Sequence, residues 1–378
     1  MKYILFFVVV CLVGGGLYLL VFGQGTTQPL PAGSSAPTSK AESATNIPKT
    51  TVIAEGLDTP WSIVFLPNKN MLVTERPGRV RLIRENTLVP QPVATLSHVY
   101  EIGEGGLLGI ALHPDFNNNH YVYLYYTYSA NGDNTLNRVV RMTYKDGILN
   151  NEEIIIDAIP GASNHNGGRI AFGPDNYLYI TTGDAQEPSH AQDKNSLAGK
   201  ILRVTDKGAT APGNPFNNRV YSYGHRNPQG ITWDNQGKLW ATEHGRSGIQ
   251  SGLDELNSIE SGDNYGWPEI QGDETRQGMK TAQTNSGNTT WAPAGIAYHE
   301  NMLYFGGLRG KSIYAVDLKD GNADKLHQVL NGEYGRIREV KKGPDNMLYI
   351  TTSNRDGRGV PAGTDDRIIR LNPQLISP

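Results

Sequence analysis

Residues 172–184, FGPDNYLYITTGD, combine a polar turn with a strand and have relatives along the whole chain. Gly-Pro-Asp-Asn is a turn sequence, because proline fixes one backbone angle and Asp and Asn side chains bond nearby amides. Tyr177–Thr182 is rich in aromatic and β-branched residues, which favour strands. Together with the apolar residues just before the turn, the stretch predicts a strand–turn–strand hairpin.

Five further segments repeat this pattern of a polar turn followed by an alternating strand. They are FLPNKNMLVTERPG from Phe65, LHPDFNNNHYVYLYYTY from Leu112, WDNQGKLWATEHG from Trp233, AYHENMLYFGGLRG from Ala297 and KGPDNMLYITTSN from Lys342. Their spacing of roughly 45–65 residues approaches the ~40–50 residues of a propeller blade with loop insertions. One four-stranded sheet cannot bury both faces alone, whereas a ring of such sheets can. The sequence predicts an all-β fold, a six-bladed β-propeller of four-stranded antiparallel blades.

Composition narrows the classes of partner. The 378 residues contain 34 Lys and Arg against 37 Asp and Glu, a formal charge of −3. The chain lacks the excess of basic residues that is typical of nucleic-acid-binding proteins, so no nucleic-acid partner is expected. The single cysteine, Cys11, lies in an apolar N-terminal segment, so the folded part is predicted to contain no disulfide and no thiol chemistry.

The N-terminus divides into two segments ahead of the propeller. Residues 1–23 carry one lysine and a long apolar run, which predicts a signal sequence or an N-terminal membrane anchor. Residues 24–49 are rich in Ser, Thr, Ala and Pro and read as a flexible tether. The propeller domain is expected to span residues 50–378. We expect an extracytoplasmic protein, periplasmic or in the cell envelope, with any membrane attachment through the N-terminal segment only.

Polar residues that the repeat itself does not require stand ahead of several strands. In a propeller, the loops that enter the inner strands face the central channel, so these side chains should meet at one channel mouth. Arginine pairs bidentately with carboxylates, and arginines at alternate positions of a strand point the same way. The pattern predicts a cationic floor of Arg226, Arg309, Arg336 and Arg338 for an anion with several carboxylates, with Glu104, His165 and Asn227 at the same mouth.

Residues 241–274 are dense in oxygen donors, including Glu243, Asp254, Glu255 and Asp263. Calcium takes about 6–8 oxygen ligands, so the stretch is a calcium candidate, although it lacks the spacing of an EF-hand. Plainer readings stand beside each of these residues. A histidine in a strand-entry loop often serves only as a hydrogen-bonding group, inner-strand arginines often pair with acidic neighbours, and Asp184 can simply cap a turn.

The motifs together resemble the family of soluble quinoprotein glucose dehydrogenases and aldose sugar dehydrogenases. The matching motifs are PWSIVFLP, GEGGLLGIALHPDF, NHNGGRIAFGPDNYLYITTGD, GHRNPQGITW, DELNSIESGDNYGWP and GRIREV, which span Pro60 to about Arg370. The resemblance implies a six-bladed propeller that uses pyrroloquinoline quinone (PQQ) and Ca²⁺. It also implies oxidation of aldose sugars at C1 to lactones, with electrons passed to an external acceptor.

The resemblance assigns catalytic roles to His165, as the base that takes the proton of the C1 hydroxyl, and to Asp184 and Arg226. It implies that PQQ is bound by His165, by Arg226 and Asn227, by Arg309 at one carboxylate, and by Arg336 and Arg338 at the others. Glu104 stands near the implied base, where many relatives have glutamine, and joins the cofactor-binding set.

For calcium, the resemblance implies two sites. The backbone carbonyls of Gly245 and Arg246 match those that hold the ion on PQQ, although the loop is longer here and Arg246 replaces a proline. Glu255 and Tyr265 match ligands of a second, structural calcium.

Two other functions compete with a PQQ-dependent aldose dehydrogenase. A calcium-dependent propeller hydrolase of the lactonase type would need carboxylate and asparagine ligands from several blades on the channel axis. Arginines there would repel the metal. A non-catalytic propeller, tethered to the envelope, would bind glycans or proteins without any redox activity.

Overall fold

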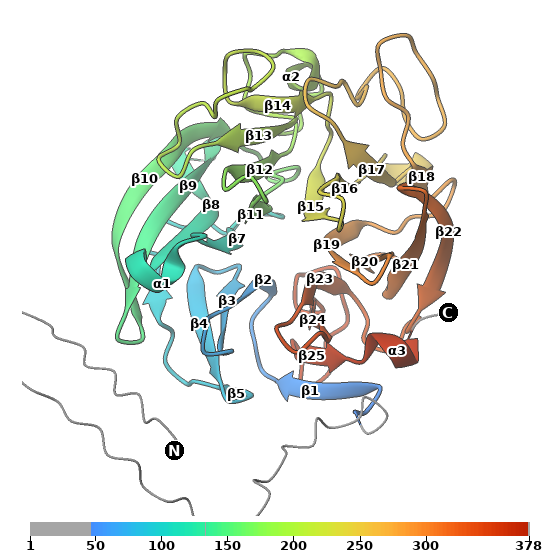
Figure 1. Ribbon diagram of the computed structural model, residues 1–378. Coiled ribbons are helices and arrows are strands. Elements are labelled where there is room, and N and C mark those ends of the chain that lie inside the picture. The colour runs from blue at the N-terminus through green and yellow to red at the C-terminus, as the bar shows by residue number, and fades with distance from the viewer. Residues whose placement is uncertain (1–46, 133, 377–378) are drawn as a thin grey trace, which may run out of the picture. The chain divides into compact units, whose positions relative to one another are not determined.

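The six predicted hairpins are each the first and second strand of one blade, and the blades follow one another in a ring (Figure 1). The computed structural model describes residues 47–132 and 134–376. The segment predicted as a signal sequence or anchor (1–23) and most of the predicted tether (24–49) lie outside these ranges. Pro48–Pro378 form one compact unit. Among the described residues, no helix has the length and apolar character needed to cross a membrane.

Every strand pairs antiparallel with its neighbour, so both the predicted fold class and the six blades are confirmed. Blade one comprises β2 (Pro60–Phe65), β3 (Met71–Glu75), β4 (Arg79–Arg84) and β5 (Thr87–Leu88), and β6 (Ala94–Thr95) also pairs with β4. Blade two comprises β7 (Leu107–Leu112), β8 (Tyr121–Asn131), β9 (Asn134–Lys145) and β10 (Ile148–Pro160). Blade three comprises β11 (Ile170–Phe172), β12 (Leu178–Thr182), β13 (Lys200–Val204) and β14 (Val220–Tyr223).

The other three blades comprise β15 (Pro228–Trp233), β16 (Leu239–Glu243), β17 (Glu255–Ile259) and β18 (Thr284–Asn285); β19 (Pro293–His299), β20 (Met302–Gly307), β21 (Ser312–Lys319) and β22 (Asn322–Val329); and β23 (Ile337–Lys342), β24 (Leu348–Thr352), β25 (Ile368–Leu371) and β1 (Thr50–Ala54). Short helical segments lie in the connections: α1 (Phe116–Asn119), α2 (Ser189–Gln192), the 3₁₀ turn Gly248–Gln250 and α3 (Pro373–Ile376).

The ring is closed by the N-terminal strand. β1 pairs with β25, with Val52 opposite Ile369, so the first strand of the domain supplies the outer strand of the last blade. This closure removes the open edge that a linear array of blades would leave.

A threonine in the second strand of several blades joins neighbouring blades. Thr74 donates its hydroxyl to the Leu108 carbonyl at 2.6 Å, Thr242 to Ala294 at 2.6 Å, and Thr351 to Pro60 at 3.2 Å. Each acceptor lies on the inner strand of the next blade, and each of these hydroxyls is buried. The β-branched residue that favours the strand therefore also provides a polar link between blades.

A buried ion pair crosses the channel between blades that are not adjacent in sequence. Arg169, ahead of β11, donates to Glu339 of β23 at 2.6 Å and to Ser62 of β2 at 2.7 Å. The Arg169 guanidinium also lies over the Trp61 ring at 4.2 Å. Because all these side chains are buried, they fill the middle of the channel.

Candidate active site

Loops that enter the inner strands, together with the β16–β17 and β24–β25 loops, line one cavity of about 450 Å³. Most residues that the sequence predicted for the cofactor and its calcium are found in its lining: Glu104, His165, Arg226, Gly245, Arg246, Arg309, Arg336 and Arg338. A second cavity of about 420 Å³ shares His165, Arg226 and Arg246 with the first, and Asp184 and Trp267 line it. The structure thus brings residues from five blades to one mouth.

His165 is held by a buried carboxylate. Its Nδ1 lies 2.7 Å from Oδ1 of Asp184, whose other oxygen accepts the indole N–H of Trp267 at 2.9 Å. Asp184 is 1% exposed, and its Oδ1 also accepts the N–H of Gln186 at 2.8 Å. A carboxylate on Nδ1 fixes the imidazole tautomer that carries its proton there, which leaves Nε2 as a hydrogen-bond acceptor.

Two glycines near His165, Gly167 and Gly183, lie where another stretch of backbone leaves no room for a Cβ. His165 has a left-handed φ of 60°. A Cβ at Gly183 would lie 2.0 Å from the His165 carbonyl oxygen, and one at Gly167 would lie 2.6 Å from the Thr181 carbonyl oxygen. The strand that begins after NHNGG can therefore pack against the strand that ends in GD only with glycine at both positions.

The arginines are buried at a cost that the protein's own groups only partly offset. Burial lowers the pKa of Arg338 to about 9 and lowers that of Arg226. Arg226 Nη2 donates to Ser247 at 2.7 Å, and Arg338 Nη1 donates to Gln229. Both Nε atoms are buried without a hydrogen-bond partner among the residues that the structure describes. Such unpaired donors around a cavity favour an anionic ligand there.

Arg336 and Arg309 differ in how they are held. Arg336 donates to Asp356 Oδ2 from Nε at 2.9 Å and from Nη2 at 2.7 Å, and to the Leu308 carbonyl at 3.1 Å. Arg309 is exposed at the cavity edge. Asn227 is fully buried beside the His165 turn, where its Oδ1 accepts the N–H of Gly167 at 3.0 Å and its Nδ2 has no partner. It is not part of the cavity lining.

The residues expected around calcium fall into two groups. Gly245 and Arg246 line the main cavity; the Gly245 N–H donates to Asp254 and the Arg246 N–H to Gly252, both at 2.8 Å. Glu255 and Tyr265 instead line a small neighbouring cavity. The Tyr265 hydroxyl is committed to the Ser258 carbonyl at 2.6 Å, so its side chain does not present an oxygen to that cavity.

The small cavity is lined by the oxygen-bearing side chains of Glu243, Glu255 and Gln271. Burial and the nearby charge of Glu243 raise the pKa of Glu255 to about 8. Within the described ranges, no lysine or arginine forms an ion pair with Glu255, and Gln271 Oε1 is buried without a partner. A hard cation would relieve the repulsion between the two carboxylates and use these oxygens as ligands.

Sequence reasoning missed three residues at the mouth. His244 lines the main cavity with its Nε2 unpartnered, and burial lowers its pKa to about 4. It follows directly after β16, so its position behind the WATE strand was an available signal. Trp267 lies in the NYGWP motif, and Arg358 lies in a loop that belongs to no repeat.

Comparison with known proteins identifies the family. A family model described as glucose/sorbosone dehydrogenase matches residues 57–369. The chain belongs to this family. The prediction of a sugar dehydrogenase is thereby confirmed at the level of the family.

Individual relatives are also named as sugar dehydrogenases. This dehydrogenase is 31% identical over 342 residues to the aldose sugar dehydrogenase YliI of Escherichia coli (strain K12), covering 81% of this chain and 90% of the relative. It is 33% identical to quinoprotein glucose dehydrogenase B of Acinetobacter calcoaceticus over 258 residues, 58% of this chain and 52% of that protein. The solved structure of the PQQ-bound aldose sugar dehydrogenase from Streptomyces coelicolor matches with a TM-score of 0.80 and 41% identity, over 85% of this chain and 97% of that one.

The lactonase alternative finds no support in the site. A lactonase would need carboxylate and asparagine ligands on the channel axis, whereas several of the side chains that line the main cavity are arginines, which attract carboxylates.

Proposed function

We propose that the protein is a PQQ- and Ca²⁺-dependent aldose dehydrogenase that oxidises aldoses at C1 to lactones and passes the electrons to an external acceptor. The observation that carries the proposal is the cavity in which buried, incompletely paired arginines lie beside a histidine held by a buried aspartate. Relatives in the same family include a structure described as PQQ-bound. We further propose that the enzyme works outside the cytoplasm.

The donor set fits a tricarboxylate quinone. Arg226, Arg336, Arg338 and the exposed Arg309 would hold its carboxylates and quinone oxygens. The Nε atoms of Arg226 and Arg338 offer donors that no described residue of the chain uses. The carbonyls of Gly245 and Arg246 would hold calcium at the cavity, and Glu255 with Glu243 would hold a second ion in the small cavity. When bound, PQQ supplies the hydride acceptor and calcium polarises it.

The chain's own residues would prepare the sugar. His165, with its Nδ1 proton on Asp184, would accept the proton of the C1 hydroxyl at Nε2. Asp184 would stabilise the resulting imidazolium and keep the ring in place through its second bond to Trp267. The side chain of His165 is 16% exposed, which lets a small substrate reach it while limiting access of water.

Reconstitution tests the proposal. Purified protein would be loaded with PQQ and CaCl₂ and assayed for dye reduction with a panel of aldoses, beside His165→Ala as the control. The proposal predicts aldose-dependent dye reduction by the wild type, its loss in the variant, and absorbance of a bound quinone in both. Absence of dye reduction with every aldose, together with no bound quinone, would overturn it.

A further inference from the structure

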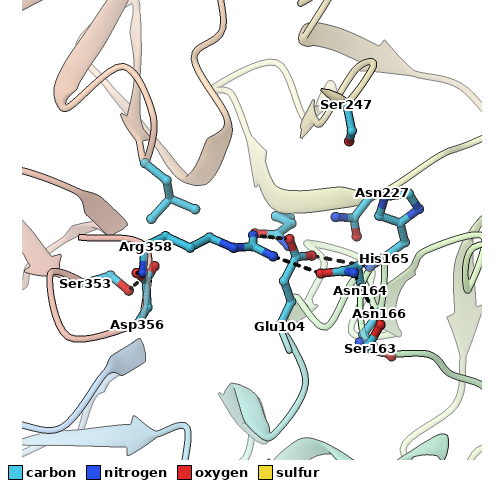
Figure 2. A network of polar contacts seen from close by, with 12 residues as sticks. Glu104, Ser163, Asn164, His165, Asn166, Asn227, Ser247, Ser353, Asp356 and Arg358 are labelled. Carbon is cyan, nitrogen blue, oxygen red and sulfur yellow. Dashed lines mark hydrogen bonds and ion pairs between the residues drawn. The ribbon is translucent and has the colours of Figure 1, made fainter. Parts of the chain in front are cut away.

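An arginine from blade six reaches across the mouth to the turn that carries His165. Arg358 lies in the loop between β24 and β25, and its Nη1 donates to Glu104 Oε1 at 2.5 Å while Nη2 donates to Asn164 Oδ1 at 2.9 Å (Figure 2). Glu104 precedes β7 of blade two and Asn164 precedes β11 of blade three. One guanidinium therefore joins loops of three blades.

The backbone at Arg358 is held in place by Asp356. Asp356, two residues earlier, accepts the N–H of Arg358 at 3.0 Å through Oδ1 and the Nε and Nη2 of Arg336 through Oδ2. The Asp356 side chain is only 2% exposed. The same loop therefore holds the cavity-lining Arg336 through Asp356 and carries Arg358 two residues further on.

The guanidinium of Arg358 meets two loops that form one unit. The Glu104 N–H donates to the Ser163 carbonyl at 2.7 Å, and Glu104 Oε2 accepts the His165 N–H at 3.3 Å. A Cβ at Gly103 would lie 2.0 Å from the Ser163 carbonyl oxygen, so the two backbones are in direct contact. Arg358 thus bonds Asn164 directly and is linked to the His165 N–H through Glu104.

Stability does not account for this arrangement. The Arg358 side chain is 54% exposed, although that of Glu104 is only 14% exposed, and an ion pair whose cation is open to water contributes little to folding. Its effect on geometry can be much larger, because small displacements of a catalytic group slow a reaction strongly. We propose that Arg358 is a positioning residue that holds the His165 turn at the cavity edge through Glu104 and Asn164. This inference rests on the proposed function.

The test compares Arg358→Gln and Arg358→Lys with a matched control. Arg370→Gln removes another partly exposed ion pair of the same blade, with Asp345 at 2.8 Å, from a residue outside the cavity. For Arg358→Gln we expect kcat at saturating PQQ to fall on the order of 10- to 100-fold. The isotope effect with C1-deuterated aldose should rise, while the melting temperature should stay within about 2 °C of wild type. Lysine should restore part of kcat, and Arg370→Gln should leave kcat unchanged.

Two further readouts separate this inference from its rivals. PQQ titration should give a dissociation constant within about twofold of wild type; a large loss of affinity with kcat intact at saturation would make Arg358 a cofactor contact and overturn the inference. In ¹⁵N-histidine-labelled protein without cofactor, the His165 imidazole signal should shift in Arg358→Gln and not in Arg370→Gln. That spectrum tests the positioning even if the wild type oxidises no aldose, and an unmoved signal would overturn it.

Discussion

Asp184→Asn offers the sharpest test of how His165 is prepared. The substitution keeps the shape of a side chain that is 1% exposed but removes the charge that meets His165 Nδ1 at 2.7 Å. Asp184 uses one carboxylate oxygen for His165 and the other for Trp267. An amide has a single oxygen, so asparagine can accept a hydrogen bond from only one of these two partners. A hydrogen bond to a charged group is worth about 1.5–3 kcal/mol. At about 1.4 kcal/mol per factor of ten, kcat should fall about 10- to 150-fold.

The assay is steady-state dye reduction at saturating PQQ, Ca²⁺ and aldose, with Asp175→Asn as the matched control. Asp175 lies in the same blade and binds Arg203 at 2.8 Å and the Tyr179 hydroxyl at 3.0 Å, away from both cavities. It should lose stability without a comparable loss of kcat. A double variant with His165→Ala should be no slower than His165→Ala alone, because Asp184 acts through that ring. Folded Asp184→Asn protein that keeps more than half of the wild-type kcat would refute the reasoning.

Three further outcomes follow from the same contacts. Arg338→Gln should weaken PQQ binding about 10- to 100-fold in a titration, since a charge-assisted bond is lost; a change below twofold would remove Arg338 from the cofactor site. Calcium at about 100 times its dissociation constant should stabilise the protein by about 2.7 kcal/mol, or roughly 4 °C in a thermal melt. Glu255→Gln should abolish most of that gain, and an undiminished gain would place the ion elsewhere. Burial lowers the pKa of Lys200 to about 7, so its contribution to stability is complete above about pH 10.5 and is lost as the pH falls through 7. Lys200→Met should flatten the pH dependence of unfolding in this window; an unchanged slope would show that Lys200 is not its source.

The fold could be predicted because its signal is local and repeated. Each blade contains a turn such as GPDN at 173–176 next to a strand such as LYITT at 178–182, and neither depends on distant residues. Ring closure by β1 could not be predicted in the same way. Val52 meets Ile369 across most of the chain, and nothing in the TTVIA sequence specifies β25 as its partner.

The candidate site divides along a similar line. His165, Arg226 and the pair Arg336 and Arg338 could be placed at one mouth because they precede an inner strand or lie at its start, and a propeller fixes the position of these strands. Arg358 could not, because it follows the second strand of its blade and reaches the mouth only through the fold of its own loop. Its partner Glu104 is 254 residues away, and no local pattern links the two.

The geometry of the site also depends on how the ring closes. The loop that carries Asp356 and Arg358 connects β24 to β25, and β25 is held on its outer side by β1. Asp356 holds Arg336 at the cavity, and Arg358 holds the turn of His165 across it. Arg169 and Glu339 make a second link between blades three and six, across the channel itself. The cationic side and the imidazole side of the cavity belong to different blades, so their separation is set by these contacts across the ring and not by any single loop. We therefore interpret the site as a property of the closed propeller.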